Sequence, residues 1–177
     1  ETIASSEKQI SNKQLWMNYI HQLQIEICSA LEKTDGKAKF ITDKWQRPEG
    51  GGGITRVISD GNVFEKGGVN TSVVFGDVTE TMKSHLKING EKWFACGLSL
   101  VIHPLNPYVP TVHANWRYFE LYDTSENIID CWFGGGTDLT PNYLFEEDAK
   151  HFHSVLKKVQ DKFDSSFYPK FKKQCDE

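Results

Sequence analysis

The chain has 177 residues, of which 38% are hydrophobic and 25% are charged, and its formal net charge is −4. This composition is typical of a globular protein and excludes a collagen, a coiled coil and a disordered tail. The net charge argues against a protein that binds nucleic acid through bulk electrostatics. No apolar run is long enough for a transmembrane segment, and the first residues do not resemble a signal peptide.

The four cysteines lie far apart in the sequence and form no CxxC pair, so we expect reduced thiols, no disulfide framework and a cytoplasmic location. Cys96 and Cys131 stand in apolar stretches and are predicted to be buried. Arginine is rare, with only Arg47, Arg56 and Arg117 in the whole chain. Arginine is a better planar clamp for carboxylates than lysine, which draws attention to these three residues.

The first predicted element is a helix with apolar residues at spacings of three and four, namely Trp16, Ile20, Leu23, Ile27 and Leu31. Ser5 or Ser6 could cap its start, and Asp35-Gly36 is a stop signal. From residue 37 to about residue 138 the pattern becomes that of strands. Candidate strands cover residues 54–59, 63–75, 93–103, 111–121 and 128–133, with a hairpin signal at 60–62 between the first two.

Two glycine runs interrupt this pattern. Residues 50–53 lack the Lys-Ser/Thr of a phosphate loop, so a flexible turn or a close backbone approach is predicted there. After the run at 134–136, Thr140 and Pro141 have the pattern of a helix cap and first helical position. Asp138 is then either a capping residue or a carboxylate presented beside the strands. A second helix is predicted over about 145–163, with a buried stripe formed by Phe145, Ala149, Phe152, Leu156, Val159 and Phe163.

Alternate side chains of a strand share one face, which brings polar residues of two predicted strands together. If the strands 93–103 and 111–121 pair, one face of the sheet carries five polar side chains, namely Ser99, His103, His113, Asn115 and Arg117. A polar face can simply be exposed to solvent, but such faces usually carry Lys, Glu and Thr. Polar residues beside apolar walls are typical of a small-molecule pocket. On the second helix, His153 lies at the edge of the apolar stripe and could reach this pocket, whereas His151 points to solvent.

Several sequence blocks resemble the oxygen-dependent coproporphyrinogen III oxidase family. They are SLVIHPLNPYVPTVHANWRYFE at 99–120, WFGGGTDLTP at 132–141, EEDAKHFH at 146–153, WQR with GGGG at 45–53, and VFEKGGVN at 63–70. The resemblance runs from about residue 15 to the end. It implies an α+β fold with a large antiparallel β-sheet flanked by helices on both faces, assembled as a homodimer. We therefore expect a single domain over 1–177 that lacks the C-terminal part of the family fold.

The resemblance also implies an activity and its residues. The family converts two propionates of coproporphyrinogen III to vinyl groups and gives protoporphyrinogen IX in haem biosynthesis, with dioxygen as co-substrate and no organic cofactor. His113 matches the proton donor and Asp138 the pyrrole-contacting carboxylate. Ser99, Asn115 and Arg117 match the substrate-binding residues. The histidines assigned to a divalent metal, such as manganese, in bacterial members fall on His103, His113 and His153.

Two other functions fit the same residues. One is a divalent-metal enzyme that uses His103, His113 and His153, which chelation would inactivate. The other is a catalytically inactive fragment that binds a tetrapyrrole, which the shortened chain makes conceivable. Turnover of coproporphyrinogen separates an enzyme from a binding module.

Overall fold

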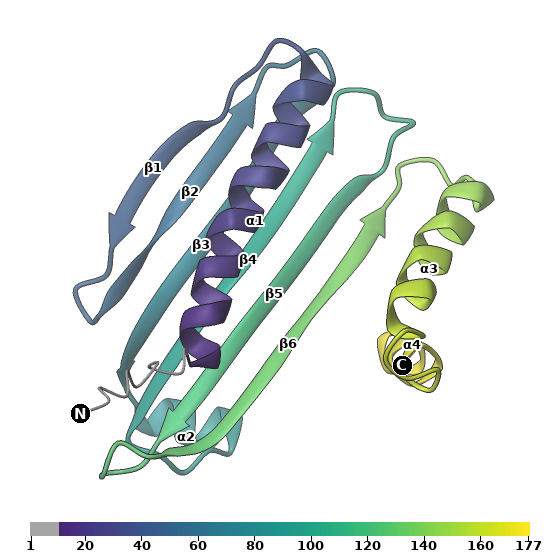
Figure 1. Ribbon diagram of the computed structural model, residues 1–177. Coiled ribbons are helices and arrows are strands. Elements are labelled where there is room, and N and C mark those ends of the chain that lie inside the picture. The colour runs from purple at the N-terminus through teal and green to yellow at the C-terminus, as the bar shows by residue number, and fades with distance from the viewer. Residues whose placement is uncertain (1–10) are drawn as a thin grey trace, which may run out of the picture.

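The computed structural model describes residues 11–177, which form one six-stranded antiparallel sheet and its helices. The strands lie across the sheet in the order in which they occur in the chain (Figure 1). They are β1 (Ile41–Gln46), β2 (Gly51–Ser59), β3 (Phe64–Asp77), β4 (Lys92–Pro104), β5 (Thr111–Tyr122) and β6 (Ile128–Thr140). The helices are α1 (Asn12–Asp35), α2 (Glu80–Leu86), α3 (Glu146–Gln160) and α4 (Phe167–Asp176). The predicted α+β class with a large antiparallel sheet is confirmed.

Helix α1 lies across β3 and β4 and supplies one layer of the core (Figure 1). The helix begins at Ser11, whose hydroxyl accepts a hydrogen bond from the Gln14 N–H, and ends at Gly36 in the left-handed region (φ 73°). A left-handed residue satisfies the last carbonyls of a helix, and glycine adopts it without steric cost. The predicted stop is thus confirmed, whereas Ser5 and Ser6 lie outside the described residues.

The core lies between α1 and one face of the sheet. Ile20 and Cys28 of the helix are buried against alternate residues of the strands, such as Val69, Leu98 and Tyr118. Gln24 is also buried, and its side-chain amide donates hydrogen bonds to the carbonyls of Ile54 and Val69, both at 2.8 Å. Buried polar groups need such partners, so this amide fixes the position of α1 over the central strands.

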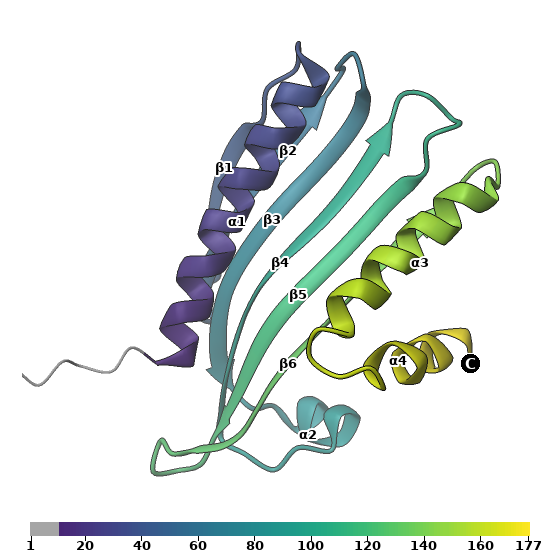
Figure 2. The ribbon, with the colours of Figure 1, turned by 45° about the vertical axis from the view of Figure 1, so that its right-hand side comes forward.

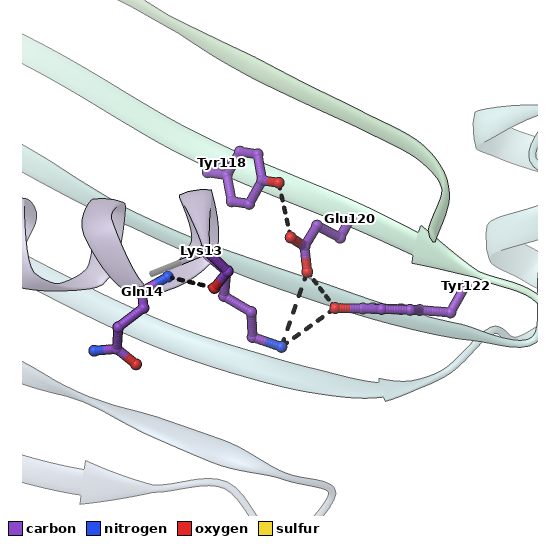
Figure 3. A network of polar contacts seen from close by, with 6 residues as sticks. Lys13, Gln14, Tyr118, Glu120 and Tyr122 are labelled. Carbon is purple, nitrogen blue, oxygen red and sulfur yellow. Dashed lines mark hydrogen bonds and ion pairs between the residues drawn. The ribbon is translucent and has the colours of Figure 1, made fainter. Parts of the chain in front are cut away.

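A second buried polar group, Glu120 of β5, lies under the first turn of α1 (Figure 3). Its carboxylate accepts hydrogen bonds from the hydroxyls of Tyr118, at 2.7 Å, and Tyr122. Lys13 of α1 completes the network, with its ammonium 3.3 Å from the Tyr122 hydroxyl and 3.8 Å above the Phe94 ring. Burial, and then the bond to Glu120, raise the pKa of both tyrosines. The network therefore attaches the start of α1 to the sheet.

The other end of α1 is attached by Asp35. Its carboxylate accepts backbone N–H groups on both sides, at 2.8 Å from Ala38 and at 2.9 and 3.1 Å from Val63 and Phe64. These hydrogen bonds hold the pKa of the Asp35 carboxyl well below its usual range. They also connect the end of the helix to the β2–β3 hairpin, which the sequence predicted at residues 60–62.

The predicted helix entry at Thr140 and Pro141 is wrong. Strand β6 continues through the glycine run as far as Thr140, which pairs with Thr111 of β5, and α3 begins only at Glu146. The ladder with β5 uses the backbone groups of this segment and holds it extended. Similarly, residues 51–53 belong to β2 and pair with β1, which the sequence did not predict. Nor did the sequence predict α2 or α4, and Pro169 lies inside the first turn of α4, where proline is tolerated.

The three longer helices lie on one side of the sheet, so helices on both faces are not confirmed among residues 11–177. Phe152 and Leu156 of α3 line a hollow with Val112 and Leu139, which alternate onto the side that α1 covers. Helices α3 and α4 lie beyond the β6 edge on that side, while the short α2 lies at one end of the sheet (Figure 2). No described helix is long and apolar enough to cross a membrane.

Two burial predictions are wrong, because fewer elements cover the sheet beyond α1. Cys96 is buried under α1, but Cys131 on β6 is exposed, because no described element covers that end of the strand. The stripe predicted for the second helix is not buried, and Phe145, Val159 and Phe163 are exposed. His151 is exposed, as predicted.

Candidate functional site

The sheet face opposite α1 carries the polar residues that the sequence predicted to lie together. Strand pairing sets Ser99 directly beside Asn115, and Arg117 beside Gly97. On the other side of β5, His113 lies beside Asp138 of β6. Residues at these positions alternate with Leu98, Trp116 and Tyr118, which face α1. The predicted pairing of the strands 93–103 and 111–121, with these polar residues on one face, is therefore confirmed.

These side chains surround a hollow of about 520 Å³ on the open face. Its lining includes all five residues predicted to act on or bind substrate, namely Ser99, His113, Asn115, Arg117 and Asp138. Glycines of β6 complete the floor. A side chain at Gly136 would meet no atom within 4 Å, so the space above this residue is open. The absence of side chains here lets a flat ligand approach the strand backbone.

Within the described part of the chain, His113 and Asp138 form the one direct contact in the hollow between an imidazole ring and a carboxylate. The distance from His113 Nδ1 to Asp138 Oδ1 is 2.7 Å, and Thr140 donates its hydroxyl to the same oxygen at 3.2 Å. The histidine side chain is 42% exposed and the aspartate side chain 61%. A carboxylate at Nδ1 favours the tautomer with a proton on that nitrogen, which leaves Nε2 to exchange protons with a ligand. Sequence reasoning found both residues but not their pairing.

Arg117 is held by its neighbour on the same strand. Its Nε donates a hydrogen bond to Asn115 Oδ1 at 3.0 Å. Among the described residues no other polar partner of this guanidinium is present, so its terminal amino groups remain free to bind an anion. Arginine presents these donors as a planar fork that matches a carboxylate. The site therefore combines an acid–base pair with a carboxylate clamp.

A second hollow of about 430 Å³ adjoins the first on the same face. Ser99, Asn115 and Arg117 line both hollows, and the second extends toward β1. It adds residues that sequence reasoning did not assign to the site, among them Trp45, Arg47, Asn70 and Ser72. Arg47 had drawn attention through the scarcity of arginine and as part of the WQR block of the resemblance, but not as a site residue. The signal that could have found the others is strand alternation carried one strand further, from Ser99 to its neighbour Asn70.

The three histidines predicted to bind a metal do not form a common cluster. The rings of His103 and His113 are neighbours, with centroids 6.4 Å apart, and His103 Nδ1 lies 3.4 Å from the Thr111 hydroxyl. His153 does reach the β6 edge and lines a small hollow with Asp138, but its Nδ1 lies 3.0 Å from the Tyr168 hydroxyl. No three His, Cys, Asp or Glu side chains among residues 11–177 are grouped to hold a metal ion. This arrangement does not fit a three-histidine metal centre.

Comparison with known proteins identifies the family. The family model described as coproporphyrinogen III oxidase matches residues 16–177, nearly the whole chain. The chain belongs to the coproporphyrinogen III oxidase family. The open face with His113, Asp138 and Arg117 is thus a site in a member of this family, and the resemblance seen in the sequence blocks is confirmed.

Named relatives of the family come from plants, animals and bacteria. The chain is 47% identical to coproporphyrinogen-III oxidase 1, chloroplastic, of Arabidopsis thaliana over 100% of its length and 48% of the relative. It is 50% identical to the oxygen-dependent coproporphyrinogen-III oxidase of Drosophila melanogaster, over 89% of the chain and 43% of the relative. The enzyme of that name from Coxiella burnetii is 49% identical over 90% of the chain and 52% of the relative. The chain thus spans about half the length of these relatives.

Proposed function

We propose that this protein catalyses the oxidative decarboxylation of two propionates of coproporphyrinogen III, with dioxygen as electron acceptor. Each propionate and one proton react with one O2 to give a vinyl group, CO2 and H2O2, so the product after two rounds is protoporphyrinogen IX. The His113–Asp138 pair beside a free arginine fork is the observation that carries this assignment. It offers a proton-transferring group and an anion-binding group in one hollow, and this reaction needs both.

The role of each site residue follows from the chemistry of its side chain. Arg117, positioned by Asn115, binds a propionate, and Ser99 contributes a hydroxyl at the next strand. Asp138 uses Oδ1 for His113 and Thr140, while its Oδ2 has no partner among the described residues and can accept a pyrrole N–H. That contact raises the electron density of the pyrrole. In its imidazolium form, His113 supplies a proton through Nε2 as peroxide forms, which is the general-acid role that histidine side chains most often take.

Other expectations stay predictions. The porphyrinogen is itself an electron-rich reductant, so the reaction requires no organic cofactor. The roles proposed above use only side chains of the protein, because the three candidate histidines are not grouped to hold a divalent metal among the described residues. Homodimer formation rests on the resemblance. The cytoplasmic location rests on cysteine usage, and some relatives are named as chloroplastic or mitochondrial.

Aerobic incubation with coproporphyrinogen III tests the proposal, with separation of the tetrapyrrole products by chromatography. We expect parent protein to form protoporphyrinogen IX, and His113→Ala to reduce the rate by about a hundredfold or more. His151→Ala is the control, because this exposed histidine on α3 lies away from the open face, and its rate should match the parent. Binding of the tetrapyrrole with no turnover by the parent would instead support the inactive binding fragment.

A further inference from the structure

We propose that Arg47 is a second carboxylate-binding residue of the open face, and that the tetrapyrrole lies across the strands with one propionate at Arg117 and another near β1. The inference rests on the proposed function, because it assumes a ligand with carboxylates on opposite sides of a ring. The observation that carries it is that both arginines line the same hollow of about 430 Å³.

Arg47 faces the hollow because of its place after β1. Trp45 pairs with Gly53, and the Arg47 N–H donates to the Gly51 carbonyl at 2.9 Å, which continues the β1–β2 pairing by one residue. The guanidinium lies 5.6 Å from the centre of the Trp93 ring. Stacking on an aromatic ring orients an arginine and leaves its edge free for an anion.

The only charged partner of Arg47 among the described residues is Glu49. Arg47 Nε lies 3.5 Å from Glu49 Oε2, and the glutamate side chain is 67% exposed. An ion pair this exposed contributes little to stability, and a ligand carboxylate can replace it. The terminal amino groups of Arg47 make no hydrogen bond with another described residue. The arrangement therefore leaves a donor fork available, as at Arg117.

The spacing of the two arginines suits a ligand wider than a single pyrrole. One cross-strand row runs from Trp45 through Gly53, Ser72 and Gly97 to Arg117. This row contains four strand spacings of about 4.8 Å each, so Trp45 and Arg117 are roughly 19 Å apart at the backbone, and Arg47 lies two residues beyond Trp45 along the chain. The long arginine side chains can shorten this gap from both ends. Between them the row carries only glycine and serine, which leaves the floor flat.

The side chain of Asn70 gives independent support for a ligand at this part of the face. Its Oδ1 is buried but has no hydrogen-bond partner among the described residues. Unpartnered buried acceptors are uncommon and costly, since their desolvation is not compensated. Asn70 lies beside Ser99, between the two arginines, where a rotation of its side chain would present this oxygen to a pyrrole N–H of a bound tetrapyrrole. A ligand with carboxylates at its rim and N–H groups at its centre matches all three positions.

The test is binding of coproporphyrin III, the stable oxidised form with the same four carboxylates, measured by fluorescence titration. Arg47→Gln should weaken binding by about tenfold, as expected for loss of a charge-assisted hydrogen bond. Lys44→Gln is the matched control, because it removes one positive charge from β1 on the opposite face and should leave the affinity within twofold of the parent. Arg117→Gln should also weaken binding by about tenfold. The affinity of the double variant should fall by about a hundredfold, because the effects of distant substitutions on the binding free energy are additive.

Each other outcome has a definite meaning. Equal affinities for Arg47→Gln and Lys44→Gln, with Arg117→Gln weakened, would overturn the role of Arg47 and leave the proposed function standing. A double variant no weaker than either single variant would show that both arginines serve one carboxylate, which contradicts the two-point arrangement. Absence of coproporphyrin binding by the parent would overturn this inference and the proposed function together. Circular dichroism of every variant confirms that the sheet is retained.

Discussion

The two faces of the sheet are built from the same strands but have opposite properties. On the face that α1 covers, Leu98 is 1% exposed and Tyr118 is 2% exposed, and the polar groups of Gln24 and Glu120 have hydrogen-bond partners. On the other face His113 and Asp138 remain largely accessible. The covered face stabilises the fold, whereas the open face retains polar groups free to bind a ligand. Alternation along each strand alone assigns a residue to one face or the other. A shift of one residue in the register of a strand would therefore move its side chains to the opposite face.

The largest expected effect concerns chemistry on the open face. Asp138→Asn keeps the shape of the side chain but removes the negative charge that orients His113 and attracts a pyrrole N–H. We expect kcat for coproporphyrinogen III to fall by about a hundredfold or more while KM changes by less than about threefold. Because Asp138 is exposed, thermal unfolding should stay close to the parent. Steady-state kinetics measures both values, and an unchanged kcat would leave Asp138 a structural role only.

A matched pair of valines tests the claim that only one face stabilises the fold. Val69 is fully buried under α1, and Val69→Ala should lower the free energy of unfolding by about 2 kcal/mol or more, through lost burial and the cavity left behind. Val101 lies on the open face of β4 and is half-buried. Val101→Ala should therefore lower it by less than about 1 kcal/mol. Urea denaturation gives both values, and equal losses would contradict the division between the faces.

Neighbouring glycines of β6 give a second pair. A Cβ at Gly135, which faces the helices, would lie 2.1 Å from the Asn115 carbonyl oxygen, whereas one at Gly136 would meet nothing within 4 Å. Gly135→Ala should disturb the β5–β6 pairing and cost about 1–3 kcal/mol, as overpacking does. Gly136→Ala should leave the melting temperature near that of the parent, yet weaken coproporphyrin binding, because its methyl group enters the hollow. If Gly136→Ala binds as the parent does, the ligand does not approach this part of the floor.

The smallest effect is expected in the buried network under α1. Tyr118→Phe leaves Glu120 with one hydroxyl donor fewer and should cost about 1–2 kcal/mol at pH 8. The pKa of Tyr118 is raised in the folded state, so the unfolded chain loses its tyrosine proton first as the pH rises above about 10. The stabilisation is therefore complete below pH 10 and declines above it, and the difference between parent and variant should narrow there. Unfolding curves at pH 8 and pH 11 measure this change.

The sequence predicted the parts of the site that depend on alternation within one strand or one pair of strands. The polar face with Ser99, Asn115 and Arg117 follows from the period of two and from the short proline-rich connection between β4 and β5. The first helix and the hairpin at 60–62 were predicted because their capping and turn residues act locally. His151 was correctly placed at the surface by the helical period.

The remainder depends on contacts between distant residues. The His113–Asp138 contact requires the register of β5 on β6, and the glycine run at 134–136 has too little strand propensity to indicate that β6 continues. The same holds for β1 and residues 51–53. The exposure of Cys131 and Phe163 depends on which layers cover the sheet, and an apolar pattern indicates only a face that can be covered. The position of Arg47 beside the second hollow depends on the pairing of β1 with β2, which the sequence did not predict.

The order of the strands has a consequence for how the protein folds. Because each strand neighbours the strand that precedes it in the chain, the sheet grows by successive hairpins and has a low contact order for a β-rich fold. Hairpins form in about 1–10 μs in isolated peptides, so little of the folding barrier arises from distant strands finding each other. His113 and Asp138 are only 25 residues apart and belong to a single hairpin, β5–β6. The geometry of the proposed acid–base pair is thus set by this one hairpin. We expect the hairpin to form before α1 packs against the other face of the sheet.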